Sequence, residues 1–265
     1  AGTGAVGIDA DTVQRLPLLG LVACFGVGID RIDLDALKQR GIRLSNTPGV
    51  VATCVADHAI GLLIALVRRI AQGDRLAHAG IWGKPAIGLT TRVSGKRLGI
   101  LGLGDIGLRI AQRAAGFDMP IGYHNRRRRP ELAHAHFESP LELAQWADYL
   151  VVACPGGAAT RHLVNAQVLE ALGPQGVLVN IARGSVVDEA ALVAALATGR
   201  LGGAALDVFE NEPGIPPALC SLDNVVLTPH IAGSTRETWR EAFDLMRDNL
   251  AAFLDGRPLP TPVGV

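Results

Sequence analysis

The chain has 265 residues, of which 49% are hydrophobic, and its 25 basic and 25 acidic side chains give a formal net charge of zero. This composition disfavours intrinsic disorder and offers no basic field for nucleic acid. The longest apolar helical stretch, residues 59–67, is too short to cross a bilayer, which needs about 20 apolar residues. We therefore expect a soluble chain of about two domains whose partner is a small molecule, since domains average roughly 150 residues.

Short runs of Val, Ile and Leu alternate with longer helical patterns along the chain, which is typical of a parallel sheet covered by helices. The predicted strands are residues 19–25, 97–103, 120–124, 149–154, 176–182, 203–209 and 224–230. The predicted helices are residues 53–72, 105–116, 140–147, 165–172, 188–198 and 234–255. Asp188 is the expected N-cap and Gly199 the expected C′ residue of one of them. The pattern predicts an α/β fold with a doubly wound parallel sheet of the Rossmann type.

The first predicted strand runs into "CFGVGID", whose glycines are typical of a tight turn. Backbone N–H groups in such a turn, around Gly26, Val27 and Gly28, can face an anion. A simple turn without a ligand is the alternative.

The segment "LGILGLGDIG" places Gly102, Gly104 and Gly107 as G-x-G-x-x-G directly after a strand and before a helix. In that context the first glycine permits a tight turn, the second lets backbone approach a pyrophosphate, and the third lets helix and strand pack closely. The helix N-terminus attracts the phosphates. A dinucleotide is therefore expected, although Asp105 inside the motif would repel a pyrophosphate unless its carboxylate turns to solvent.

The next predicted strand ends in "HNRRRRP", with Asn125 lying 18 residues after Gly107. An NAD-binding domain carries an acidic residue about 20 residues after the glycines, where it binds the ribose 2′-hydroxyl. Here Asn125 is neutral, and Arg126 and Arg127 offer planar donors suited to a 2′-phosphate. The sequence predicts that NADP(H) is preferred and that NAD binds with lower affinity, with Arg128 and Arg129 as a solvated basic turn.

Seven segments occur in one order from the beginning to the end of the chain: "FGVGIDRID", "NTPG", "VADHAIGLLIAL", "GLGDIG", "NIARGSVVDEAALVAAL", "GAALDVFENEP" and "LTPHIAGST". Together they resemble the D-isomer-specific 2-hydroxyacid dehydrogenases, most closely the glyoxylate, hydroxypyruvate and hydroxyphenylpyruvate reductase branch. The resemblance implies a smaller α/β substrate domain beside the coenzyme domain. We expect that substrate domain to be incomplete at its front.

Reduction of a 2-oxo acid needs a cation that holds the carboxylate and an acid that protonates the developing alkoxide. Arg183 ends a predicted strand and suits the cation, while His230 ends another and suits the acid. Glu212, in the loop "ENEP", suits a carboxylate that orients the imidazole and favours its charged form. An Arg or Glu in a loop is by itself more often a solvated charge. The resemblance assigns the catalytic roles to these three residues.

The resemblance also implies the binding residues. The amides of Val27 and Gly28, with Arg183, would grip the substrate carboxylate, and Asp207 would contact the nicotinamide carboxamide. The implied cofactor-binding residues are Gly102, Gly104, Asp105, Ile106, Gly107, Asn125, Arg126, Arg127, Cys154, Pro155, Ile181, Ala182, Asp207, Ala232 and Gly233.

The resemblance further predicts a coenzyme domain over residues 51–232, a substrate domain over 1–50 and 233–265, and an active site in the cleft between them. The helix at 53–72 and the loop after it match segments that pair subunits, so we expect a homodimer. The four cysteines lack metal-ligand spacing, which predicts reduced thiols in a cytoplasmic chain without a metal. His134 and His136 resemble a metal pair, but a solvated surface is the favoured interpretation.

The leading hypothesis is an NADPH-dependent reductase of glyoxylate or hydroxypyruvate. An aromatic pyruvate such as hydroxyphenylpyruvate is the alternative substrate. A nucleotide-sensing protein, like the corepressors that share this fold, is the alternative from another class.

Overall fold

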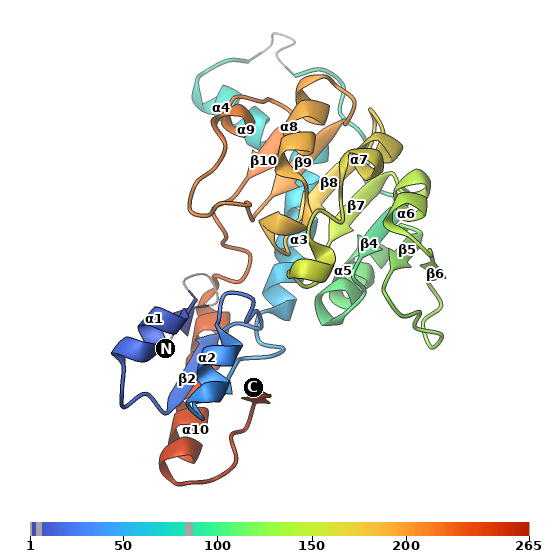
Figure 1. Ribbon diagram of the computed structural model, residues 1–265. Helices are drawn as coiled ribbons and strands as arrows, with labels where there is room; N and C mark the ends of the chain where they lie inside the picture. Colours follow the sequence, from blue (N-terminus) through green and yellow to red (C-terminus); the bar gives the residue numbers. More distant parts are fainter. Residues whose placement is uncertain (1, 4–6, 83–86, 265) are drawn as a thin grey trace. The chain divides into compact units, whose positions relative to one another are not determined.

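A computed structural model describes residues 2–3, 7–82 and 87–264 (Figure 1). The chain divides into two compact units. The smaller unit comprises Ala1–Cys54 and Gly233–Val265, and the larger unit comprises Val55–Ala232.

The larger unit is built on a seven-stranded sheet in the order β10-β9-β8-β7-β4-β5-β6, with every neighbouring pair parallel. Its strands are β4 (Leu98–Leu101), β5 (Ile121–His124), β6 (Ala135–His136), β7 (Tyr149–Val152), β8 (Val177–Asn180), β9 (Gly203–Leu206) and β10 (Val225–Leu227). All residues of the four strands β4, β7, β8 and β9 are buried, as expected for a sheet covered on both faces. The prediction of a doubly wound α/β fold is confirmed.

Two helices, α3 (Ala52–Val67) and α4 (Ile70–His78), precede the first of these strands, and further helices and short 3₁₀ turns lie between the strands. The latter are α5 (Asp105–Ala115), α6 (Pro140–Trp146), η1 (Ala158–Thr160), α7 (Ala166–Leu172), η2 (Gly184–Val186), α8 (Glu189–Ala197) and α9 (Pro217–Cys220). One buried cluster joins Leu143 of α6, Leu169 of α7 and Leu192 of α8 to Leu150 and Leu178 of the sheet.

The predicted limits of α8 are confirmed. The Asp188 carboxylate accepts a hydrogen bond of 3.0 Å from Ala191 N, as an N-cap does, and Gly199 follows the helix with a φ of +67°.

The prediction of one helix over residues 53–72 is wrong, because the chain forms α3 and α4 with a break at Arg68 and Arg69. Arg69 takes a left-handed φ of +52°, which ends the first helix without a glycine or proline. The residues change at the break: α3 is mostly apolar and packs into the core, whereas α4, "IAQGDRLAH", is largely polar and has no buried residue. The first helix therefore ends where its apolar run ends.

Several predicted strands also extend too far at their carboxyl ends. β7 ends at Val152 rather than Cys154, β9 at Leu206 rather than Phe209, and β10 at Leu227 rather than His230. The apolar run continues only after β7, whereas Asp207 follows β9 and Thr228 follows β10; in all three cases the chain leaves the ladder and turns at the edge of the sheet.

The smaller unit carries a four-stranded sheet in the order β1-β2-β3-β11. β1 (Gly2–Thr3), β2 (Leu21–Phe25) and β3 (Arg43–Ser45) are parallel, and β11 (Pro262–Val263) pairs antiparallel with β3. Val13 of α1 (Ala10–Arg15), Leu37 of α2 (Leu34–Gln39) and Val22 of β2 share its core, and α10 (Arg236–Leu254) packs on β2. A second, smaller α/β unit was expected, but the sequence pattern missed α1, α2, β3 and β11.

Candidate active site

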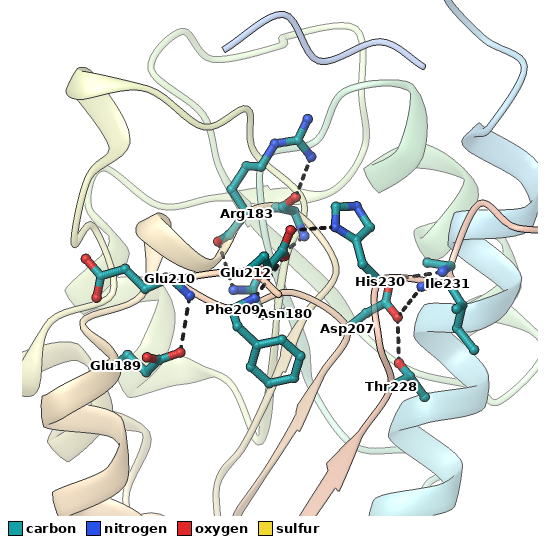
Figure 2. A network of polar contacts seen from close by, with 12 residues as sticks. Asn180, Arg183, Glu189, Asp207, Phe209, Glu210, Glu212, Thr228, His230 and Ile231 are labelled. Atoms are coloured by element: carbon teal, nitrogen blue, oxygen red, sulfur yellow. Dashed lines mark hydrogen bonds and ion pairs between the residues drawn. The ribbon is translucent and has the colours of Figure 1, made fainter. Parts of the chain in front are cut away.

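Three neighbouring strands of the larger unit carry the candidate catalytic residues at their carboxyl ends. Arg183 follows β8, Glu212 lies in the loop after β9, and His230 follows β10. Because these strands are parallel neighbours, their loops meet at one edge of the sheet, where ligands bind in open α/β folds. Figure 2 shows the three side chains extending from these loops.

Glu212 and His230 form a hydrogen-bonded pair. Glu212 Oε2 lies 3.0 Å from His230 Nδ1, and Glu212 Oε1 accepts a bond of 3.1 Å from the N–H of Phe209 (Figure 2). The glutamate side chain is only 14% exposed and the histidine 38%. Because Nδ1 faces the carboxylate, Nε2 is the ring nitrogen that can present a proton to a ligand.

The backbone of His230 is held in an uncommon conformation. Its φ is +54°, in the left-handed region, and its N–H donates to the carbonyl oxygens of Asp207 at 2.8 Å and Thr228 at 3.0 Å. These bonds direct the histidine away from the end of β10.

Asp207 fixes the same turn through its side chain, which is 1% exposed. Its carboxylate accepts from Thr228 Oγ1 at 2.6 Å and from the N–H groups of Ile231 and Ala232, each at 2.9 Å. Burial alone would raise the pKa of Asp207, but these hydrogen bonds and one from His58 outweigh it and lower that pKa. The contact between Asp207 and the nicotinamide stays a prediction. The sequence did not predict that Asp207 also anchors the turn that carries His230.

Arg183 is held by hydrogen bonds to residues of its own loop. Asn180 donates from Nδ2 to Arg183 O at 3.0 Å, and Arg183 Nη1 donates to Ala182 O at 2.8 Å. The aliphatic stem lies against Gly156, where an added Cβ would stand 2.6 Å from Arg183 Cγ. The bare backbone of Gly156 therefore gives the arginine stem its place.

The glycine loop after β4 is tightly packed at two of its glycines and open at the third. Gly102 has a φ of +100°, and a Cβ there would lie 2.5 Å from Cys154 N, while a Cβ on Gly107 would collide with Gly102 O. A Cβ on Gly104 would meet nothing within 4 Å, so backbone beside α5 is open to a ligand. This arrangement fits a pyrophosphate at the helix N-terminus.

Asp105 opens α5, and its carboxylate lies 3.1 Å from Arg109 Nε on the same helix, with both side chains well exposed. This pairing turns the acid outward and offsets its charge near the expected phosphate site. Ile106 occupies the same first turn.

The loop after β5 is tied to the glycine loop. Asn125 Oδ1 accepts from Leu103 N at 2.6 Å, and Arg129 Nη1 donates to Leu103 O at 3.1 Å. The expectation of a solvated side chain is therefore wrong for Arg129. Arg126 and Arg127 are exposed and make no hydrogen bond or ion pair with any residue that the structure describes.

The remaining predicted cofactor residues of the larger unit lie at the same sheet edge. Cys154 and Pro155 follow β7, Ile181 and Ala182 follow β8, and Ala232 follows β10, whereas Gly233 begins the returning part of the smaller unit. Cys154 is buried, and burial raises the pKa of its thiol to about 11.

Val27 and Gly28 lie in the smaller unit, in a loop whose carbonyl oxygens accept hydrogen bonds from the segment after β3. Val27 O accepts from Asn46 Nδ2 at 3.1 Å, and Gly26 O accepts from Thr47 N at 3.0 Å. Among the described residues, none accepts a hydrogen bond from the N–H of Val27 or Gly28. These two donors are available to an anion.

The described ranges 2–3, 7–82 and 87–264 hold neither a candidate membrane span nor a candidate metal centre. No helix there has both the length and the apolarity to span a bilayer. No three His, Cys, Asp or Glu residues there gather in a way that could hold a metal ion.

Comparison with known proteins gives matches over nearly the whole chain. The family profile "D-isomer specific 2-hydroxyacid dehydrogenase, NAD binding domain" matches residues 60–232. A hydroxyphenylpyruvate reductase of Plectranthus scutellarioides is 49% identical over 262 residues, which cover 99% of this chain and 84% of that protein. A glyoxylate/hydroxypyruvate reductase of Arabidopsis thaliana is 50% identical over the same shares.

Among solved structures, the NADPH-dependent glyoxylate/hydroxypyruvate reductase of Sinorhizobium meliloti, in complex with NADP and malonate, superposes with a TM-score of 0.92. It is 43% identical, and the match covers 100% of this chain and 84% of that one.

Proposed function

The chain belongs to the D-isomer specific 2-hydroxyacid dehydrogenases, NAD(P)-dependent oxidoreductases, and we propose that it reduces glyoxylate and hydroxypyruvate with a preference for NADPH. The single observation that carries the catalytic assignment is the Glu212–His230 pair, which lies beside Arg183 at the ends of three adjacent strands. The relatives named above support the substrate class.

The residues present fit a dinucleotide phosphate. Backbone at Gly104 is open, the start of α5 faces the same place, and Arg126 and Arg127 have no competing partner among the described residues. We assign the pyrophosphate to the glycine loop and the 2′-phosphate to Asn125, Arg126 and Arg127. When bound, NADPH supplies the hydride that reaches C2 of the oxo acid.

The protein's own groups then complete the reduction. Arg183 binds the substrate carboxylate and polarises the carbonyl oxygen with its planar fork of donors. His230 gives the proton on Nε2 to the developing alkoxide oxygen, so that the product is a 2-hydroxy acid. Glu212, 3.0 Å from Nδ1, orients the imidazole so that Nε2 faces the substrate.

Two backbone donors of the smaller unit are also assigned to the substrate carboxylate in this proposal. The N–H groups of Val27 and Gly28 find no acceptor among the described residues and suit a carboxylate oxygen. We accordingly assign the substrate domain to residues 1–50 and 233–265 and the coenzyme domain to residues 51–232.

We further propose a homodimer that forms through α4 and the segment after it. Ile81, Trp82 and Leu89 expose apolar side chains there. Trp82 is 90% exposed, and a tryptophan so exposed suits a surface that a second subunit covers. The four cysteines are free thiols, which fits a cytoplasmic protein.

The deciding experiment is NADPH oxidation against a panel of glyoxylate, hydroxypyruvate, hydroxyphenylpyruvate and pyruvate. We expect the highest kcat/KM for glyoxylate or hydroxypyruvate. A preference for hydroxyphenylpyruvate would favour the aromatic alternative. Tight NADPH binding without turnover of any oxo acid would contradict the enzyme and favour a nucleotide-sensing protein.

A further inference from the structure

A second charged cluster lies next to the catalytic loop and has no part in the mechanism above. Glu210 Oε1 accepts from Arg161 Nη2 at 2.8 Å and lies 3.0 Å from His162 Nε2. The N–H of Glu210 donates to Glu189 Oε2 at 3.2 Å (Figure 2). We call these four residues the Glu210 cluster.

The Glu210 cluster ties together loops from three adjacent strands. Arg161 and His162 follow β7 and η1, Glu210 follows β9, and Glu189 opens α8 beyond β8. His162 also donates its N–H to Ser185 O at 2.9 Å, and Ser185 lies two residues after Arg183. The cluster therefore holds the Arg183 loop and the Glu212 loop to the same neighbour.

Two residues of the cluster are in energetically unfavourable environments or conformations. His162 has a φ of +50°, a left-handed conformation that only a few per cent of residues other than glycine adopt. Burial, with the nearby negative charge of Glu210 in addition, raises the pKa of Glu189, and the N–H of Glu210 partly compensates. Such outliers persist where surrounding contacts determine them, and they gather at functional sites.

A contribution to stability alone does not account for this arrangement. Arg161 is 57% exposed, and exposed ion pairs contribute only about 0–1 kcal/mol. Glu210, in contrast, is 20% exposed and adjoins Phe209, whose N–H holds Glu212 Oε1. Holding Glu210 therefore holds the backbone donor that orients the catalytic carboxylate.

From these contacts we propose that Glu210 is a positioning residue: clamped by Arg161 and His162, it keeps Phe209 and Glu212 in the register that presents Glu212 to His230. This inference rests on the proposed function. According to this inference, kcat depends on the Glu210 carboxylate, although that carboxylate contacts neither substrate nor cofactor.

The test compares Glu210→Ala and Glu210→Gln with the parent protein, with Glu170→Ala as the control. Glu170 is an exposed glutamate on α7 for which the structure gives no polar contact. We expect Glu210→Ala to lower kcat about 10- to 100-fold, the range that a small misplacement of a catalytic group produces. The KM for the oxo acid and the Kd for NADPH should stay close to parental values, because Arg183 and the glycine loop keep their own contacts.

Glu210→Gln should restore most of kcat, because its amide oxygen can still accept from Arg161 or His162. The same Glu210→Ala change is then made in a Glu212→Gln background, where we expect little further loss, since the group to be positioned is already altered. Equal losses in both backgrounds, or a kcat that falls only in step with Tm, would overturn the inference.

The proposed function fails separately from this inference. If the parent protein turns over no oxo acid, the proposed function is wrong. If the parent is active and Glu212→Gln impairs it while Glu210→Ala does not, only the positioning role of Glu210 is wrong.

Discussion

The cofactor preference can be tested by replacing Arg126 and Arg127 together with glutamine. Both guanidinium groups are exposed and have no polar partner among the described residues, so the substitution breaks no internal contact. Any loss of affinity therefore reports on the ligand rather than on the fold.

The size of the effect follows from the number and the exposure of the contacts. A hydrogen bond to a charged group contributes about 1.5–3 kcal/mol, and the lower end applies here because solvent screens both arginines. Two contacts of about 1.5 kcal/mol each amount to about 3 kcal/mol, or about 150-fold in Kd. NADH lacks the 2′-phosphate, so its Kd should change less than about threefold.

The assay is a fluorescence titration of NADPH and NADH at one fixed ionic strength, with two single variants as controls. Arg128→Gln changes an exposed side chain with no described polar partner, so it should weaken NADPH much less than the double variant does. Arg129→Gln removes the donor to Leu103 O, which shapes the glycine loop, and should weaken both cofactors to the same extent.

Equal losses of NADPH and NADH in the double variant would refute the 2′-phosphate assignment. A selective loss of NADPH in Arg129→Gln would instead show that the phosphate reaches Arg129 and that its bond to Leu103 breaks on binding.

Further expectations concern the reacting groups and their surroundings. Arg183→Lys should lower kcat/KM by about 100-fold or more, because an ammonium cannot reproduce a planar fork, and full activity would contradict bidentate recognition. Glu212→Gln replaces the carboxylate that lies 3.0 Å from Nδ1 of His230 and should lower kcat for reduction about 10-fold or more without weakening NADPH binding; unchanged turnover rejects the pair. His230→Ala should lose most turnover but keep NADPH affinity, and near-normal turnover would reject the acid. Gly156→Ala places a Cβ 2.6 Å from Cγ of Arg183 and should raise the KM for the oxo acid about 10-fold without changing NADPH affinity; an unchanged KM would mean that the stem has room. Because burial raises the Cys154 pKa to about 11, the thiol should resist iodoacetamide at pH 8, and rapid labelling in a mass spectrum would contradict its burial.

Much of the larger unit is predictable because its strands are short, apolar and separated by capped helices. Gly102, Gly104 and Gly107 identify the phosphate loop, since only a strand, tight turn and helix in succession require glycine at these positions. The predicted strands that begin at Gly203 and Asn224 were too long because they included the segments that turn at the sheet edge, and those segments carry Asp207 and His230.

What could not be predicted depends on tertiary contacts. Arg129 looks like its three basic neighbours in the sequence, and only the fold places Leu103 O within its reach. Asp207 looks like an exposed strand-end acid, yet it is buried under Thr228 and two amides. The break at Arg69 does have a local signal that the prediction passed over, because the apolar run of α3 ends at Val67 and α4 carries Gln72, Asp74 and Arg75.

The smaller unit is assembled from two separated stretches of chain, and this has a consequence for biosynthesis. The ribosome makes all of residues 55–232 before α10, which packs on β2, and before β11, which pairs with β3. Domains fold as units while the chain is still growing. We therefore expect the larger unit to be folded before α10 has been synthesised. Until translation reaches residue 254, the face of β2 that α10 later covers is exposed on the nascent chain. During that period a chaperone could bind this exposed face.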